Sequence, residues 1–126
     1  MFRTMMKSKI HRATLTEANL NYVGSITIGE NLATEARLIE NELVQVVNLN
    51  NGSRLETYVI YGAAGSGSIG LNGAAARLGA SGDLVIVISY AMYSEEELEN
   101  YEPMVVMVDE QNHITSLRRT EMNPLS

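Results

Sequence analysis

A hairpin signal in the middle of the sequence restricts this chain to folds that contain an antiparallel sheet. Residues 43–49 and 54–61 form two runs of strand-like sequence, and Asn51-Gly52 lies between them. These two residue types tolerate the positive φ angles of a tight turn. The segment is therefore predicted to be a β-hairpin whose second strand carries Arg54, Thr57 and Tyr58.

Strand-like alternation also marks the N-terminal segment. In residues 2–10 apolar side chains recur on one side, and Lys9 and His11 share the other. The segment 22–28 is predicted to be extended, which places the Gly24-Ser25 pair inside a strand. Further strands are expected over residues 84–89, 104–108 and 113–117.

Short helices are expected between these strands. Thr14 and Glu17 have the spacing of a capping box, which predicts a helical turn through Leu20, and Ser94 and Glu97 repeat that spacing. The remaining expected elements are a short helix over 31–37, a flexible loop over 62–70 and a helical turn over 73–78. Together they predict a mainly β domain with short helices, most simply a closed barrel.

Composition limits the classes of function. The chain has 126 residues, 45% of them apolar, which fits a single domain over residues 1–126. It has no cysteine and only two histidines, so we expect no metal site. A net charge of -6 disfavours nucleic acid as a partner. The start has no apolar leader and no run is long enough to span a bilayer, so we expect a cytoplasmic protein without a membrane partner.

The N-terminal segment is locally cationic in this acidic chain. The first acidic residue, Glu17, is preceded by Arg3, Lys7, Lys9 and Arg12. Such a segment either attracts a small anion or forms a solvated basic edge.

Several segments together resemble one enzyme family. They are RTMMKSKIHRAT (3–14), YVGSITI (22–28), NGSRLETY (51–58), LNGAAAR (71–77) and GDLVIV (82–87). In this order and spacing, from the N-terminus to about Pro103, they resemble the pyruvoyl-dependent aspartate 1-decarboxylases of bacteria. Each segment alone is a weak signal, and the collinear set is a strong one.

The resemblance implies a fold and a reaction. The fold is a small six-stranded double-psi β-barrel, assembled as a homotetramer with active sites between subunits. The proenzyme cleaves itself at Gly24-Ser25 into residues 1–24 (β chain) and 25–126 (α chain). Ser25 becomes a pyruvoyl group that forms a Schiff base with L-aspartate, without pyridoxal phosphate or a metal. The products are beta-alanine, for pantothenate and coenzyme A biosynthesis, and carbon dioxide.

The resemblance also implies residue roles. Thr57 stabilises the oxyanion of self-processing and contacts the substrate, and Tyr58 donates a proton after decarboxylation. Lys9 and Arg54 bind the substrate carboxylates. Supporting roles around the centre are implied for Tyr22 and His11. The segment implied to line the site consists of Asn72, Gly73, Ala74 and Ala75. Asn72 is also implied to position the hydroxyl of Ser25.

Other interpretations of these residues stay open. Thr57 is also an ordinary strand residue, and Lys9 and Arg54 are also ordinary surface charges. Neighbouring strand residues point to opposite faces, so Thr57 and Tyr58 need a local twist or bulge to reach one centre. The family pattern has an acidic residue at Gly29 and a Glu-Arg pair at Ala63-Ala64, so the processing rate and loop order here are open.

The function has alternatives as well. The chain is either the enzyme, with or without an accessory maturation factor, or an unprocessed barrel that serves as a binding or assembly module. A pyruvoyl enzyme for another amino acid is the remaining alternative.

Overall fold

The structure, a computed structural model, describes residues 1–21 and 24–119, most of them in strands. The strand order in the sheet is β2-β6-β3-β5-β4-β7-β1-β8-β9. This confirms the predicted mainly β fold. The strands are β1 (Phe2–Thr14), β2 (Glu17–Asn19), β3 (Ser25–Gly29), β4 (Leu43–Asn48), β5 (Arg54–Gly62), β6 (Ile69–Asn72), β7 (Leu84–Ser94), β8 (Met104–Val108) and β9 (Ile114–Arg118). The helices are α1 (Glu30–Glu35), the 3₁₀ helix η1 (Gly73–Leu78) and α2 (Glu95–Leu98).

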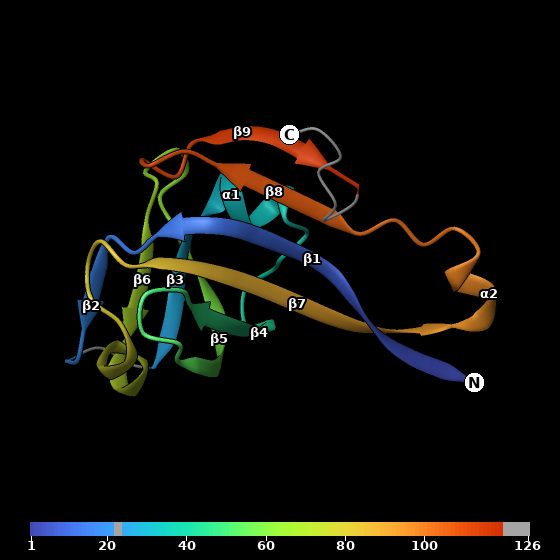
Figure 1. Ribbon diagram of the computed structural model, residues 1–126, viewed down its shortest axis with the longest axis horizontal. Helices are drawn as coiled ribbons and strands as arrows, with labels where there is room; N and C mark the ends of the chain where they lie inside the picture. The colour runs from blue at the N-terminus through green and yellow to red at the C-terminus, as the bar shows by residue number, and fades with distance from the viewer. Residues whose placement is uncertain (22–23, 120–126) are drawn as a thin grey trace.

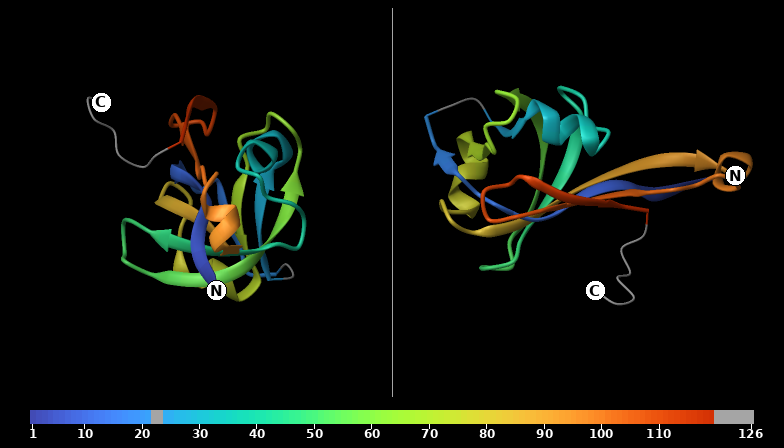
Figure 2. Two further views of the ribbon diagram at one scale, coloured as in Figure 1. Left: turned by 90° about the vertical axis from the view of Figure 1, so that its right-hand side faces the viewer. Right: turned by 90° about the horizontal axis from the view of Figure 1, so that it is seen from above.

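The strands curl around one core, and a long arm projects from it (Figure 1). The arm is the outer part of the antiparallel pair β1 and β7, with α2 and the N-terminus at its far end (Figure 2). The core consists of fully buried aliphatic side chains from several strands and α1, among them Ile10, Ile26, Leu32, Val59 and Val87. The sheet thus combines a packed body with a two-stranded extension.

Strand β1 departs from the regular alternation predicted for it. Its pairing with β7 shifts register between Met6 and Ser8 and again between Ile10 and Ala13. Lys9 is only 5% exposed and lies opposite Ile88 on β7. A solvated basic edge is therefore wrong for Lys9, although it holds for the exposed Arg3 and Arg12.

The helical turn predicted from the Thr14 and Glu17 spacing is wrong. Residues 17–19 form strand β2, which runs parallel to β6 with Glu17 opposite Gly70. A Cβ on Gly70 would lie 2.8 Å from Cγ of Glu17, so the missing side chain permits this close approach. Pairing with β6 gives this segment backbone partners that outweigh its local helical preference.

The other expected elements are found close to their predicted positions. The hairpin forms as β4 and β5, and Gly52 in its turn has a φ angle of 77°. The capping box of Ser94 and Glu97 is present at the start of α2. The expected short helices form as α1 and η1, and the late strands as β7, β8 and β9.

The loop expected to be flexible, residues 62–70, is held at several points. Gly65 N donates to Oδ1 of Asn31 at 2.7 Å. The carbonyl of Gly67 accepts a hydrogen bond of 2.8 Å from Nδ2 of the buried Asn112. Residues 69 and 70 of the segment belong to β6. The ends of the segment are thus strand and not loop, and side chains from α1 and the β8–β9 turn bond to the backbone between them. The flexibility of this loop stays a prediction.

The closed six-stranded double-psi arrangement stays a prediction. The sheet contains three parallel pairs among its antiparallel ones: β1 with β8, β2 with β6, and β3 with β5. Parallel neighbours need crossover connections, which the predicted barrel also contains. In the described part of the chain, none of the helices has the length and apolar character needed to cross a bilayer.

Candidate active site

Ser25 begins strand β3 and is completely buried. Its partner in the antiparallel pair with β6 is Asn72, and the side chains of the two residues meet. Nδ2 of Asn72 donates a hydrogen bond of 2.8 Å to Oγ of Ser25. The structure therefore places the amide of Asn72 in hydrogen-bond contact with the serine hydroxyl, and its positioning role in the reaction stays a prediction.

Thr27 is a residue of this site that the sequence reasoning missed. Nδ2 of Asn72 also donates to Oγ1 of Thr27, at 2.9 Å. The alternation of a strand was the available signal, because Thr27 lies two residues after Ser25 and therefore points to the same face. The result is a polar trio of Ser25, Thr27 and Asn72 on the face of β3 opposite Ile26 and Ile28.

A pocket of about 400 Å³ lies beside this trio. Gly24, the residue before Ser25, forms part of its wall, and a Cβ built on Gly24 would meet no heavy atom within 4 Å. The scissile bond expected at Gly24-Ser25 thus joins a residue on the pocket wall to a buried one. The remaining walls come from β5 (Leu55, Glu56, Thr57 and Tyr58) and from η1 (Ala74, Ala75 and Leu78).

Thr57 and Tyr58 both reach this pocket without a bulge. The pairing of β5 with β4 has no register shift over these residues. On its other side β5 is paired with the described residues of β3 from Val59 onward. Residues 55–58 all border the pocket, so residues of both strand faces reach it. The pairing with β4 shows no bulge at Thr57 or Tyr58, and the convergence of the two side chains on one reaction centre stays a prediction.

The helix η1 forms the opposite wall. Its first residue, Gly73, has a φ angle of 63°, which lets the chain turn sharply after Asn72. Ala76 faces the core, whereas Ala74 and Ala75 face the pocket. Small side chains at these positions let a ligand approach the backbone. The predicted site residues from β5 and η1 are thus brought together with Gly24.

The two predicted carboxylate ligands lie elsewhere. Among the described residues, neither Lys9 nor Arg54 lines this pocket. Nη1 of Arg54 is 3.3 Å from Oε1 of Gln45, on the neighbouring strand β4. His11 lines a different pocket, with Arg12 and Asp109. Tyr22 lies outside the described residues.

The charge of the pocket matters for any acidic ligand. Among the described residues that line it, Glu56 is the one with a charge at neutral pH. A dicarboxylate in this space would therefore meet a like charge and no cation from the same wall. Cationic groups must come from outside this set of lining residues if such a ligand is to bind.

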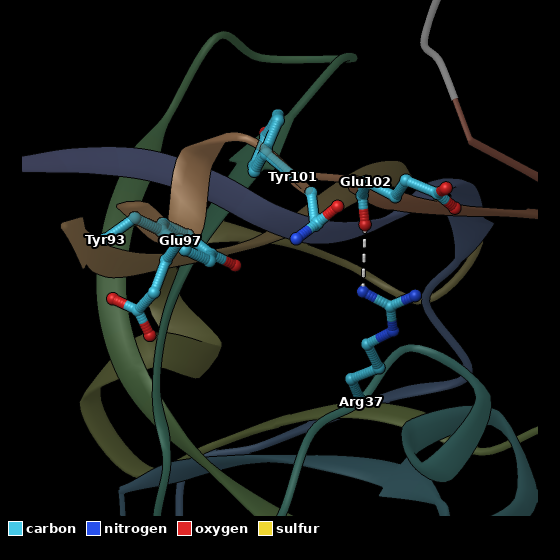
Figure 3. A pocket seen from close by; sticks show the side chains of 6 residues that line it. Arg37, Tyr93, Glu97, Tyr101 and Glu102 are labelled. Carbon is cyan, nitrogen blue, oxygen red and sulfur yellow. Dashed lines mark hydrogen bonds between the residues drawn. The ribbon is translucent and has the colours of Figure 1, made fainter. Parts of the chain in front are cut away.

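A second pocket, of about 500 Å³, lies between Arg37 and residues of the arm in and around α2 (Figure 3). It is lined by Arg37, Tyr93, Tyr101 and other polar residues that precede Pro103. Nη1 of Arg37 donates to the carbonyl of Glu102 at 3.0 Å, and the Tyr93 and Tyr101 rings pack edge to face at 5.4 Å. Because it contains none of the predicted site residues, this larger pocket is not the candidate active site.

Comparisons with known proteins bear on the family of this chain. The family model described as aspartate decarboxylase matches residues 1–115. The chain is 60% identical over 123 residues to the aspartate 1-decarboxylase of Carboxydothermus hydrogenoformans, with 98% of this chain and 97% of the relative covered. It is 61% identical over 121 residues to that of Acetivibrio thermocellus, with 96% of each chain covered. The chain therefore belongs to the aspartate decarboxylase family.

Proposed function

We propose that this protein is an aspartate 1-decarboxylase that converts L-aspartate to beta-alanine and carbon dioxide. One observation carries the proposal: Gly24, Thr57, Tyr58 and η1 converge on a pocket beside a buried Ser25 in a member of this family. The pantothenate and coenzyme A pathway in the cytoplasm is the proposed setting.

The proposal includes self-cleavage between Gly24 and Ser25. Oγ of Ser25 bonds to the carbonyl carbon of Gly24, and the peptide C–N bond breaks to leave an ester and a free amine. Loss of the Cα proton and of the ester oxygen then releases the carboxylate of residues 1–24 and leaves dehydroalanine at residue 25. Water converts dehydroalanine to a pyruvoyl group and ammonia. The bond from Asn72 supports this step, because it holds the attacking oxygen in place.

The residues around position 25 fit a pyruvoyl group. Residue 25 is the first residue of β3, so a chain cut before it keeps every following residue of the strand paired with β5 and β6. Asn72 would hold the group from the side of β6. When bound, the group supplies an electron-withdrawing carbonyl that accepts the electrons left by departing carbon dioxide.

The pocket residues have separate proposed roles. The hydroxyl of Thr57 donates a hydrogen bond to the oxyanion that forms on Gly24 during cleavage. The phenol of Tyr58 donates a proton to the carbon that has lost carbon dioxide. The backbone of Gly73, Ala74 and Ala75 approaches the substrate. Both side chains from β5 border the pocket, which supports these roles.

We infer that Lys9 and Arg54 bind the substrate carboxylates within a homotetramer. Arg54 lies outside the pocket of its own chain, which contains no basic lining residue among those described. An adjacent copy that supplies Arg54 would provide the missing positive charge at a boundary between subunits. Lys9 is buried between β7 and β8, and its contact with the substrate is part of the same proposal.

Intact-mass measurement of the purified protein tests the proposal. We expect wild type to give two fragments, with the larger one lacking a free N-terminal amine, and to release carbon dioxide from L-aspartate. Ser25→Ala should give one full-length species without activity. A single full-length wild-type species would favour the unprocessed binding or assembly module. Release of carbon dioxide from another amino acid in a panel would instead identify that amino acid as the substrate.

A further inference from the structure

The two walls of the active-site pocket are joined by a cluster of asparagine side chains outside it. The cluster consists of Asn48, at the end of β4, and Asn51, in the turn between β4 and β5. Both donate through Nδ2 to the same acceptor, the carbonyl oxygen of Leu78, at 3.2 Å and 3.0 Å. Leu78 is the last residue of η1, and it also lines the pocket.

Asn48 uses the full hydrogen-bonding capacity of its side chain. Nδ2 donates to Oδ2 of Asp83 at 2.9 Å as well as to Leu78. Oδ1 accepts from the backbone N–H groups of Asn50 and Asn51, at 2.8 Å and 3.2 Å. Asn48 itself is 2% exposed, whereas its partner Asp83 is only partly buried. Asn48 therefore links the hairpin turn directly to the end of η1.

The same turn sets the position of the other wall. The backbone of Asn48 donates to Ser53 at 2.8 Å and accepts from Gly52 at 2.9 Å, which closes the turn. Strand β5 begins at the next residue, Arg54, and brings Thr57 and Tyr58 to the pocket. One turn thus holds the start of β5 and the end of η1.

Close packing at Gly79, the residue after η1, restricts where the end of this helix can lie. Gly79 follows Leu78, and a Cβ there would lie 2.7 Å from Cδ1 of Leu15 and 3.3 Å from Nδ2 of Asn48. The chain therefore passes in close contact with the core and the cluster at this point. The end of η1 is held by hydrogen bonds on one side and by packing on the other.

We propose that Asn48 and Asn51 are positioning residues that hold η1 against β5 in the arrangement that binds substrate. This rests on the proposed function, because η1 and β5 are the walls of the proposed active site. Loosening the bond to Leu78 lets η1 populate other positions. Only the fraction of molecules in the competent arrangement then binds, so KM rises while kcat at saturation is preserved.

The test compares Asn51→Asp with Asn50→Asp. Asn51→Asp keeps the oxygen that accepts from Ser53 N but removes the donor to Leu78. Asn50→Asp adds the same charge one residue earlier and keeps the oxygen that accepts from Leu84 N, and it touches no atom of η1. Any effect of charge or turn stability alone is common to both variants.

We expect Asn51→Asp to raise KM for L-aspartate by about five- to tenfold with kcat within about twofold, as loss of one hydrogen bond allows. Activity is normalised to the cleaved fraction by intact mass. Hydrogen exchange of the peptide over 73–78 should become faster in Asn51→Asp, with Asn50→Asp like wild type in both measurements.

The positioning role is wrong if Asn51→Asp and Asn50→Asp have the same KM for L-aspartate. It is also wrong if the two variants have the same hydrogen-exchange rate over residues 73–78. An inactive wild type would contradict the proposed function instead, and the exchange measurement would still decide whether Asn51 holds η1.

Discussion

One amide nitrogen contacts two polar residues beside the proposed cleavage site. Nδ2 of Asn72 donates both to Ser25 and to Thr27, so its two hydrogens are used and its rotamer is fixed. Because these side chains are largely buried, a lost partner leaves a polar group without water to replace it. The orientation of the Ser25 hydroxyl thus depends on a residue, Thr27, that has no proposed chemical role.

Thr27→Val tests this dependence. Valine keeps the shape of threonine but removes the acceptor, which should lower the free energy of unfolding by about 1 kcal/mol. The freed Asn72 amide should also slow self-cleavage several-fold, measured as the intact-mass time course after purification. Thr115→Val, on an exposed position of β9, is the matched control. Equal cleavage rates in the two variants would show that Thr27 does not orient the site.

Strands β1 and β7 are joined to the segment before β4 by one carboxylate. Oε2 of Glu42 accepts from Nζ of Lys7 at 2.5 Å and from Oγ of Ser89 at 2.9 Å, and Oε1 accepts from Ile39 N. Partial burial raises the pKa of Glu42, but the hydrogen bonds from Lys7, Ile39 and Ser89 outweigh it. They hold the pKa below its ordinary value of 4.5.

The lowered pKa of Glu42 predicts acid-sensitive stability. A carboxylate with a depressed folded-state pKa stabilises the fold above its ordinary value, and the contribution disappears as the pH falls from 4.5 through the folded-state value. Glu42→Gln should lower the free energy of unfolding by about 1–2 kcal/mol at neutral pH. The difference from wild type should shrink in acid, as measured by denaturant unfolding across pH. Glu99→Gln, at an exposed position, should show no such convergence, and a constant difference for Glu42→Gln would contradict the linkage.

At the scale of the whole molecule, a single chain contains an incomplete version of the proposed site. The pocket holds the cleavage site and the walls from β5 and η1, whereas Arg54 lies outside it. Large exposed apolar side chains, including Ile39, Leu43 and Met92, leave surface for contact with another copy. A shared site in a homotetramer accounts for both observations.

Coexpression of Arg54→Ala with Ser25→Ala tests the shared site. At an aspartate concentration below saturation, each variant alone should release no carbon dioxide. In mixed oligomers a site with Ser25 from one copy and Arg54 from another should form, and about a quarter of the sites should be intact for random assembly. Carbon dioxide release from the purified mixture provides the measurement. No recovery in demonstrably mixed oligomers would place both residues in the same chain's site.

Local chemistry determined much of the fold in advance. The Asn51-Gly52 turn, the capping box at Ser94 and the apolar strands needed only neighbouring residues, and all of them are found. The site residues on β5 and η1 came from a family resemblance that holds over the chain. Their roles stay predictions.

Tertiary pairing decided what local patterns could not. Residues 17–19 became a strand because β6 offered hydrogen-bond partners, and the loop over 62–70 is held by Asn31 and Asn112 from distant segments. Thr57 and Tyr58 border one pocket with Gly24 and η1, which lie far from them in the sequence. Each outcome depends on which strand lies beside which, and residues far apart in sequence settle that through burial and backbone pairing.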